Sequence, residues 1–285
     1  MPLGTSFADA ESSYSDSDVM IYGVPYDRTT SFRAGSREAP CAVRRASYGF
    51  ELNHFEHSVD LGEVRMHDLG DLDDYLRPED MNDEITFCVS PAVRDKKFTV
   101  AIGGEHSITA PIVRCFDRVS VISVDAHLDS RDEFMGSPHS HACVMRRCSD
   151  HVGIDNVFVL GVRSISNEEL ERDDIVPHVD SYEIMENGME RAIERALDSV
   201  KNEKIYLSID IDGIDPAFAP GTGTQEPFGL RPIDVKKLMN AVGGRMAGMD
   251  VVEISPPYDP SGITSALGAR LIKEGISIYA KHNLI

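Results

Sequence analysis

Two short segments of the chain carry acidic and histidine side chains at every second position. Asp125, His127 and Asp129 alternate in one of them, and Asp210 and Asp212 alternate in the other. Alternate residues of a β-strand point to the same side, so each segment presents its polar side chains together. Carboxylates and imidazoles bind divalent metal ions, and the two segments together therefore predict a metal centre.

Such a centre is costly without cations. Carboxylates buried together raise one another's pKa, because each negative charge disfavours ionisation of the next. Two divalent ions are the simplest way to offset that cost. A third segment, Gly-Gly-Glu-His at 103–106, offers another imidazole, because glycine lets the backbone approach a ligand closely. His106 could instead cap or pack here, and its spacing from Glu105 turns the two side chains apart.

The elements that position these residues follow from the hydrophobic pattern. Strands are expected at 19–24, 64–69, 98–102, 119–124, 157–160, 205–211 and 249–254, with a weaker one near 175–179. Helices are expected at 39–48, 78–89, 108–116, 141–151, 189–200, 232–242 and 265–281. Alternating strands and helices predict a parallel sheet with helices on both faces.

The polar segments share one place in this pattern. Each lies at or just after the carboxyl end of an expected strand, and so does Glu253. Ligand sites of open α/β sheets form at that edge, so residues distant in the sequence can converge there. No linker or repeat divides the chain, which predicts a single domain over 1–285 with a flexible or loosely packed segment at 1–18.

Three motifs in this order resemble the ureohydrolase family, which includes arginases and agmatinases. They are Gly-Gly-x-His at 103–106, Asp-Ala-His-x-Asp at 125–129 and Ser-x-Asp-x-Asp-x-x-Asp-Pro at 208–216. The resemblance extends from about residue 19 to residue 271. It implies a single three-layer αβα domain with an eight-stranded, mainly parallel sheet, two Mn²⁺ per chain, and a homo-oligomer that is a trimer or a hexamer.

The resemblance also implies the ligand set. His106, Asp125, Asp129 and Asp210 would bind one ion, and Asp125, His127, Asp210 and Asp212 would bind the other, with Asp125 and Asp210 bridging. Imidazoles and carboxylates without thiolate suit Mn²⁺, although these residue types leave Zn²⁺, Co²⁺ and Fe²⁺ open. Two ions about 3.5 Å apart would lower the pKa of a bridging water, and the resulting hydroxide would attack a guanidinium carbon. Asp129 would also accept a hydrogen bond from that hydroxide.

A guanidinium substrate must be oriented, and its leaving amine must be protonated. We expect Glu253 to orient it, because a carboxylate pairs with guanidinium through two parallel hydrogen bonds. Pairing of Glu253 with Arg270 is the structural alternative. His141 corresponds to the proton-shuttle histidine of the family, and an imidazole titrates in the required range. His139 in the same loop is a competing candidate.

The tail of the substrate distinguishes the family members. Arginases recognise an α-carboxylate and an α-amine through Asn and Ser in the loop after Asp-Ala-His-x-Asp, and the loop 130–138 contains no Asn. Asp132 and Glu133 in this loop would repel a carboxylate and attract an ammonium group. Agmatine carries a guanidinium head and an ammonium tail. The expected reaction is therefore hydrolysis of agmatine to putrescine and urea, in polyamine biosynthesis.

Other functions fit part of the pattern. A guanidinobutyrase-like, guanidinopropionase-like or arginase-like hydrolase would take a substrate with a carboxylate. An inactive metal-binding scaffold would lack a metal ligand, His141 or Glu253, and none of these is missing. A zinc deacetylase of related architecture would have one metal and an adjacent His-His pair, which the chain does not contain.

Composition and charge narrow the classes of partner that we expect the protein to bind. The chain has 28 basic and 48 acidic residues and a formal charge of −20, which argues against nucleic acid and anionic membranes and favours a small cationic substrate. No apolar stretch approaches the ~20 residues of a membrane span, and the first 18 residues do not resemble a signal peptide. Five scattered cysteines suggest reduced thiols and a cytoplasmic location.

Overall fold

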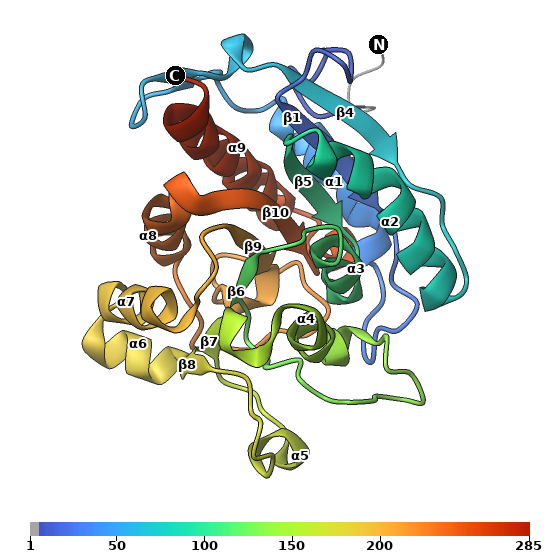
Figure 1. Ribbon diagram of the computed structural model, residues 1–285, viewed down its shortest axis with the longest axis vertical. Helices are drawn as coiled ribbons and strands as arrows, with labels where there is room; N and C mark the ends of the chain where they lie inside the picture. The colour runs from blue at the N-terminus through green and yellow to red at the C-terminus, as the bar shows by residue number, and fades with distance from the viewer. Residues whose placement is uncertain (1–5) are drawn as a thin grey trace.

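An eight-stranded parallel sheet runs through the centre of the protein, as the computed structural model shows for residues 6–285 (Figure 1). The strand order is β4-β1-β5-β10-β9-β6-β7-β8. The strands are β1 (Val19–Val24), β4 (Met66–Asp71), β5 (Phe98–Gly103), β6 (Ser120–Val124), β7 (Val157–Val162), β8 (His178–Asp180), β9 (Ile205–Asp210) and β10 (Met246–Val252). All eight expected strands are present, and the predicted α/β fold is confirmed.

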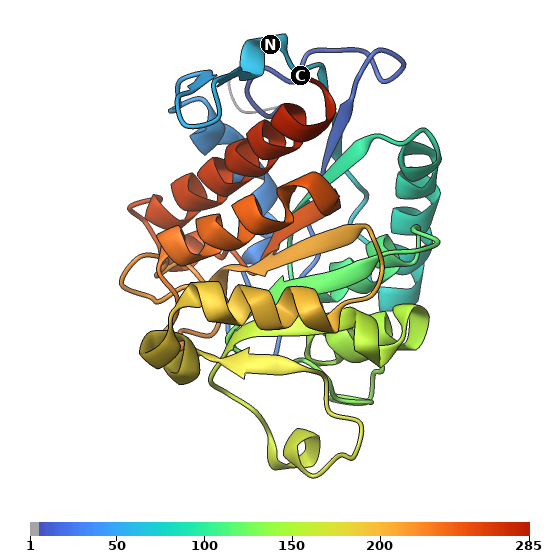
Figure 2. The same cartoon turned by 60° about the vertical axis from the view of Figure 1, so that its left-hand side comes forward.

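Helices cover both faces of the sheet (Figure 2). The helices are α1 (Ala39–Ser47), α2 (Pro78–Arg94), α3 (Thr109–Val113), α4 (Val144–Val152), α5 (Asn167–Leu170), α6 (Ser181–Asn187), α7 (Met189–Ser199), α8 (Pro232–Val242) and α9 (Ile263–Asn283). Helices α1, α7, α8 and α9 share one buried apolar cluster, whereas α2, α3 and α4 share the other. Strand residues alternate between the two clusters: Ile21 joins the first, and Tyr22 joins the second. The burial of both sheet faces explains the nearly continuous apolar strands.

The expected elements differ from the observed ones mainly at short segments. Helices α5 and α6 and the small antiparallel hairpin of β2 (Asn53–His54) and β3 (Val59–Asp60) were not expected from the hydrophobic pattern. Helix α6 has only 7 residues, which is too short to establish a helical period. Its start is instead marked by the Asp180 side chain, which accepts a hydrogen bond from the backbone N–H of Glu183.

Part of the amino-terminal segment packs against the core. Phe7 is fully buried in the core, and its backbone N–H donates to the Asp68 carboxylate. The backbone N–H of Ala8 donates to the hydroxyl of Ser47, at 2.8 Å. Apolar burial and hydrogen bonds to residues far along the chain thus anchor part of residues 6–18, and the flexibility expected for 1–18 stays a prediction. Residues 1–5 lie outside the described part of the chain.

The described helices also bear on the membrane question. Among residues 6–285, no helix combines the length and apolar character that crossing a bilayer requires.

Candidate metal centre and substrate cavity

Four adjacent strands deliver polar side chains to one edge of the sheet. Strands β5, β10, β9 and β6 are neighbours and run parallel. Asp210 is the last residue of β9, Asp125 directly follows β6, and Glu253 directly follows β10. His106 begins a 3₁₀ turn three residues after the end of β5. The sheet therefore brings four distant segments to one place, as the motif positions predicted.

One imidazole nitrogen lies among three carboxylates. The Nδ1 of His106 is 3.1 Å from Oδ2 of Asp125 and 3.2 Å from Oδ2 of Asp210. It is also 3.3 Å from Oδ2 of Asp129. His106 and Asp125 are fully buried, and the other His106 ring nitrogen, Nε2, faces the Ser208 hydroxyl at 3.0 Å. Because Nε2 faces Ser208, Nδ1 is the ring nitrogen that faces the three carboxylates.

The contacts within this group are not ordinary hydrogen bonds. Within the described residues, the Nδ1 of His106 and the Oδ2 of Asp125 are buried and have no hydrogen-bond partner, although they lie 3.1 Å apart. Buried polar atoms without partners are rare, because each has lost its contact with water. Ligand atoms that converge on a common point without bonding one another fit a metal ion between them.

A second group shares one member with the first. The Nδ1 of His127 is 3.1 Å from Oδ2 of Asp212 and 3.6 Å from Oδ1 of Asp125. Asp125 thus directs one oxygen to each group, as a bridging ligand would. Asp210 directs Oδ2 to the first group, while its Oδ1 accepts the backbone N–H of Asp212 at 2.9 Å. A bridging role for Asp210 stays a prediction.

Electrostatics also favour cations at this centre. Burial raises the pKa of Asp210 well above its usual value, and the charges of Asp212 and Asp125 raise it further. Burial and the charge of Asp125 likewise raise the pKa of Asp129. The raised pKa values of these two carboxylates reflect the cost of burying their negative charges together, and divalent ions would offset that cost.

Unusual backbone conformations turn two of the acids. Asp129 and Glu253 have positive φ angles of 48° and 61°, a region that few non-glycine residues adopt. The backbone N–H of Glu253 donates to the carbonyl of Gly104, which is packed so closely that a Cβ there would lie 1.9 Å from the Tyr26 carbonyl oxygen. The Glu253 Oε1 then accepts the backbone N–H of His106 at 2.8 Å. Strained, tightly determined backbone of this kind is typical of functional sites.

The comparisons with known proteins agree with this arrangement. Residues 17–277 match the Arginase family. The chain belongs to the arginase family. It is 32% identical over 280 residues to an agmatinase of Halalkalibacterium halodurans, with 95% of each chain covered. It is 36% identical over 268 residues to the N(1)-aminopropylagmatine ureohydrolase of a Synechocystis strain, covering 87% of this chain and 85% of that protein.

Solved structures give the same result. The agmatine ureohydrolase of Thermoplasma volcanium superimposes with a TM-score of 0.94 at 38% identity, covering 98% of this chain and 95% of that chain. The proclavaminate amidino hydrolase of Streptomyces clavuligerus superimposes with a TM-score of 0.85 at 30% identity, covering 94% and 93%. The protein is thus an agmatinase-like member of the arginase family, a hydrolase that acts on an amidine C–N bond.

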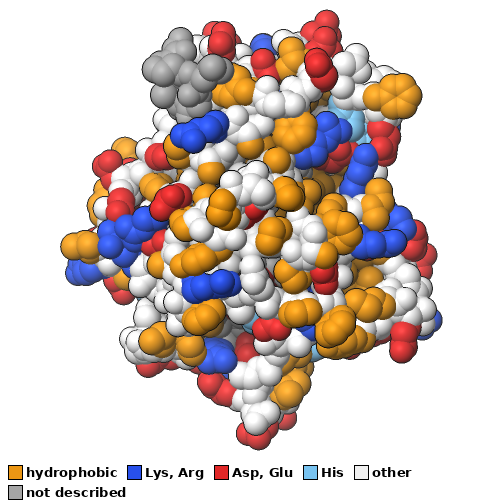
Figure 3. Space-filling model, turned by 180° about the vertical axis from the view of Figure 1, so that it is seen from behind, with side chains coloured by type: hydrophobic (Ala, Val, Ile, Leu, Met, Phe, Trp, Pro, Cys, Tyr) orange, Lys and Arg blue, Asp and Glu red, His pale blue; other side chains and the backbone are white. Residues whose placement is uncertain are grey.

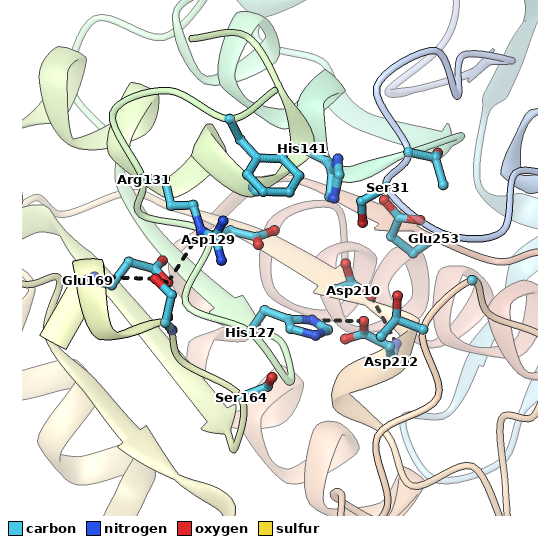
Figure 4. A pocket seen from close by; sticks show the side chains of 16 residues that line it. Ser31, His127, Asp129, Arg131, His141, Ser164, Glu169, Asp210, Asp212 and Glu253 are labelled. Carbon is cyan, nitrogen blue, oxygen red and sulfur yellow. Dashed lines mark hydrogen bonds and ion pairs between the residues drawn. The ribbon is translucent and has the colours of Figure 1, made fainter. Parts of the chain in front are cut away.

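The cavity of this arginase-family protein opens onto candidate metal ligands (Figure 4). His141 and Glu253 line it, together with His127, Asp129, Asp210 and Asp212. His139 does not line this cavity and lies near Asn82 instead. Arg270 contacts His54 and Glu274, and so is not the partner of Glu253. The geometry thus favours His141 over His139 as a cavity residue, and it does not place Arg270 beside Glu253.

The two acids expected to bind the tail lie elsewhere. Asp132 is an exposed residue that pairs with Arg146, Arg147 and Arg172, and neither Asp132 nor Glu133 lines the cavity. The structure does not bring Asp132 and Glu133 to the cavity, so it gives no support to their expected contact with the tail. The sequence pattern placed charges in the right loop but could not show that arginines from α4 and from the segment after α5 hold Asp132 at the surface.

Glu169 and Arg131 line the cavity, although the motifs did not indicate Glu169. The carboxylate of Glu169 accepts the backbone N–H groups of Ser130 and Ser166 and the Ser166 hydroxyl. The guanidinium of Arg131 lies 3.8 Å from Glu169 and 4.5 Å from the centre of the Phe134 ring. Ser-x-x-Glu at 166–169 is a capping box at the start of α5, and this sequence signal could have located the turn.

Proposed function

We propose that the protein hydrolyses agmatine to putrescine and urea with two Mn²⁺ ions. The observation that carries the proposal is the presence of a carboxylate on either side of one cavity. Glu253 and Glu169 lie on opposite sides of the view in Figure 4, with His127 and Asp129 between them. A substrate with a cation at each end, a guanidinium head and an ammonium tail, matches this distribution of charge.

The described ligands fit two ions. His106, Asp125, Asp129 and Asp210 would hold one ion, and Asp125, His127, Asp210 and Asp212 would hold the other. Bound ions would supply a water of lowered pKa as the nucleophile near neutral pH. The unpartnered buried atoms of His106 and Asp125 support this assignment.

Glu253 is proposed to bind the guanidinium head. Burial raises the pKa of Glu253 well above its usual value, and the charge of Glu105 raises it further. A guanidinium beside Glu253 would favour the ionised form and pair with it through two hydrogen bonds. The backbone N–H of His106 donates to Oε1 and restrains the carboxylate, which would favour one orientation of the bound head.

His141 is proposed to protonate the leaving amine. Burial lowers its pKa, so the imidazole is predominantly neutral near pH 7 and accepts a proton before passing it on. Its ring meets the edge of Phe134, with the ring centres 6.0 Å apart at 87°. Asp129 lies within the same cavity and is proposed to accept a hydrogen bond from the nucleophile.

Glu169 takes the tail-binding role that the sequence suggested for Asp132 and Glu133. Its carboxylate is buried, and Arg131 lies beside it at a distance longer than a hydrogen bond. An ammonium tail would contact Glu169 next to Arg131. Putrescine, the amine product, would keep the same tail contact until release.

A second candidate rests on Arg131 itself. Its guanidinium lines the cavity, and it would attract the carboxylate of a guanidinobutyrase-type substrate. Urea release from agmatine, arginine and 4-guanidinobutyrate, measured side by side, separates the candidates. Agmatine is expected to give the highest kcat/KM, and a preference for 4-guanidinobutyrate would overturn the agmatine proposal.

Assembly and location complete the proposal. We propose a homo-oligomer, a trimer or a hexamer, that acts in the cytoplasm in polyamine biosynthesis. The face seen in Figure 3 carries many exposed apolar side chains among charged ones, and such surfaces are often covered by a partner. Light scattering on the purified protein gives the mass, and a monomer would contradict the assembly.

Metal analysis that finds one ion per chain would contradict the binuclear centre.

A further inference from the structure

Glu105 is a fully buried acid that points away from both metal-binding groups. It lies between the end of β5 and His106, and its backbone N–H donates to the Tyr26 carbonyl at 2.7 Å. Its carboxylate reaches Thr29, in the loop after β1, and Ser107. The proposed reaction steps do not use Glu105, so its burial calls for another explanation.

The partners of Glu105 are all donors. Its Oε2 accepts the backbone N–H of Thr29 at 2.7 Å, and its Oε1 accepts the hydroxyls of Thr29 and of Ser107, the latter at 2.6 Å. All three contacts place a donor on a carboxylate oxygen, and the backbone N–H of Thr29 can only donate. In this arrangement Glu105 acts as an acceptor, and it occupies the single hydroxyl proton of Thr29.

The other contacts of that hydroxyl are with His141. The backbone N–H of His141 donates to Thr29 Oγ1 at 3.0 Å, and the ring Nδ1 of His141 lies 3.3 Å from the same oxygen. A hydroxyl has one proton to donate and two lone pairs to accept with. Because the proton goes to Glu105, the oxygen can only accept from the ring, and Nδ1 must carry a hydrogen.

The direction of these hydrogen bonds determines which ring nitrogen of His141 carries the proton. A neutral histidine with its proton on Nδ1 has a free lone pair on Nε2. Ser140 Oγ also lies 3.3 Å from Nδ1, and a serine hydroxyl is able to act as donor or acceptor, so it imposes no order of its own. Only the Thr29 hydroxyl has a determined hydrogen-bond direction, because its proton is donated to Glu105.

We propose that Glu105 and Thr29 are positioning residues that hold neutral His141 as the Nδ1–H tautomer, with Nε2 as the nitrogen that exchanges protons in the cavity. The inference rests on the proposed role of His141 in protonating the leaving amine. Carboxylate partners that select the tautomer of a catalytic histidine act on the rate through that histidine alone. Here the carboxylate acts through one intervening hydroxyl.

Thr29→Val tests the proposal, because valine keeps the shape of threonine and removes the hydroxyl. We expect kcat to fall by about 10- to 100-fold, within the range of general acid–base catalysis, while KM changes less than about threefold. Thr29→Ser, which restores a hydroxyl, is expected to recover most of kcat. Thr99→Val is the matched control: Thr99 is fully buried in β5, its hydroxyl has no partner among the described residues, and no kinetic change is expected.

A double-mutant cycle separates positioning from a general loss of structure. In a His141→Asn background, Thr29→Val is expected to cost less than about twofold, because the residue through which it acts is gone. An undiminished effect in that background would overturn the proposal. Equal metal content in all variants is expected, since Thr29 contacts no metal ligand within the described residues.

A tautomer measurement tests the inference without turnover. Nitrogen NMR of ¹⁵N-histidine-labelled protein, loaded with diamagnetic Zn²⁺, reports which ring nitrogen of His141 carries the proton, and His141→Asn assigns the signal. We expect Nδ1–H in the parent and in Thr99→Val, and a shift toward Nε2–H in Thr29→Val. An Nε2–H signal in the parent, or an unchanged signal in Thr29→Val, would refute the inference. A parent that releases no urea from any guanidino substrate would instead refute the proposed function, while the spectrum would still decide the tautomer.

Discussion

The Nδ1 of His106 and the Oδ2 of Asp125 lie 3.1 Å apart in a fully buried site, yet they form no hydrogen bond with each other. The second oxygen of Asp125 lies 3.6 Å from the Nδ1 of His127. This one carboxylate therefore joins the two candidate metal-binding groups. Its removal is the most direct test of the centre.

Asp125→Asn is expected to remove both ions and all measurable turnover. The amide keeps the volume of the side chain but offers one oxygen and no charge, so neither group retains a complete donor set. Metal analysis after gel filtration checks the occupancy, and circular dichroism checks that the fold is retained. A folded variant that keeps its full metal content would contradict the bridging role.

Glu253→Gln is expected to leave the metals in place and to impair the reaction. Its carboxylate lies beside the ligands but does not belong to either group of candidate donors. Loss of its charge should lower kcat/KM for agmatine by about 100-fold or more, in the range seen when one charge-stabilising group is removed. Unchanged agmatine hydrolysis would show that another residue orients the guanidinium.

Glu169→Gln is expected to weaken binding of the ammonium tail. Loss of a charged hydrogen-bond partner costs roughly 1.5–3 kcal/mol, so KM for agmatine should rise by about 10- to 100-fold. Glu190→Gln makes the same change at an exposed position on α7 and should leave KM unaltered. If Asp132→Asn raised KM for agmatine and Glu169→Gln did not, the ammonium tail would bind at Asp132 and not at Glu169.

Ionic strength is expected to lower kcat/KM for agmatine. The chain has a net charge of −20, and a dicationic substrate is drawn toward it by a field that salt screens within about 10 Å at 0.1 M. A zwitterionic guanidino acid should respond less in the same salt series. Equal salt dependence for both substrates would show that steering does not contribute.

Acid stability should depend on Glu274, on α9. Burial alone would raise its pKa, but hydrogen bonds from His54 and His57 and the charge of Lys236 lower it to about 2. Its folded pKa is below its ordinary value of 4.5, so its contribution to stability is complete above about pH 4.5 and is lost as the pH falls toward 2. The Tm of Glu274→Gln should therefore lie below that of the parent at pH 7, and the difference should narrow at pH 3.

Thermal unfolding of the metal-free proteins, followed by circular dichroism, measures this difference without a contribution from metal loss. The exposed control Glu190→Gln should show a much smaller change in Tm at either pH, because surface ion pairs contribute little. A Tm difference for Glu274→Gln that is independent of pH would mean that packing, and not the charge of Glu274, accounts for its effect.

The sequence alone determined the fold class and the candidate metal ligands. The alternation at 125–129 and 210–212 is a local, two-residue period, and the carboxyl ends of parallel strands necessarily share one edge. Residues such as Asp125 and Asp210 could therefore be placed together before any coordinates were known. The same reasoning identified Glu253, because it too directly follows a strand.

The tertiary structure decided where the loop residues lie. Asp132 pairs at the surface with Arg172, 40 positions away, and Glu169, whose side chain takes part in the capping box of α5, lines the cavity. The link from Glu105 through Thr29 to His141 joins three segments separated by 76 and 112 positions. Loop conformation depends on such contacts between residues far apart in the sequence. These contacts produce no periodic pattern of residue types, so the sequence alone does not reveal them.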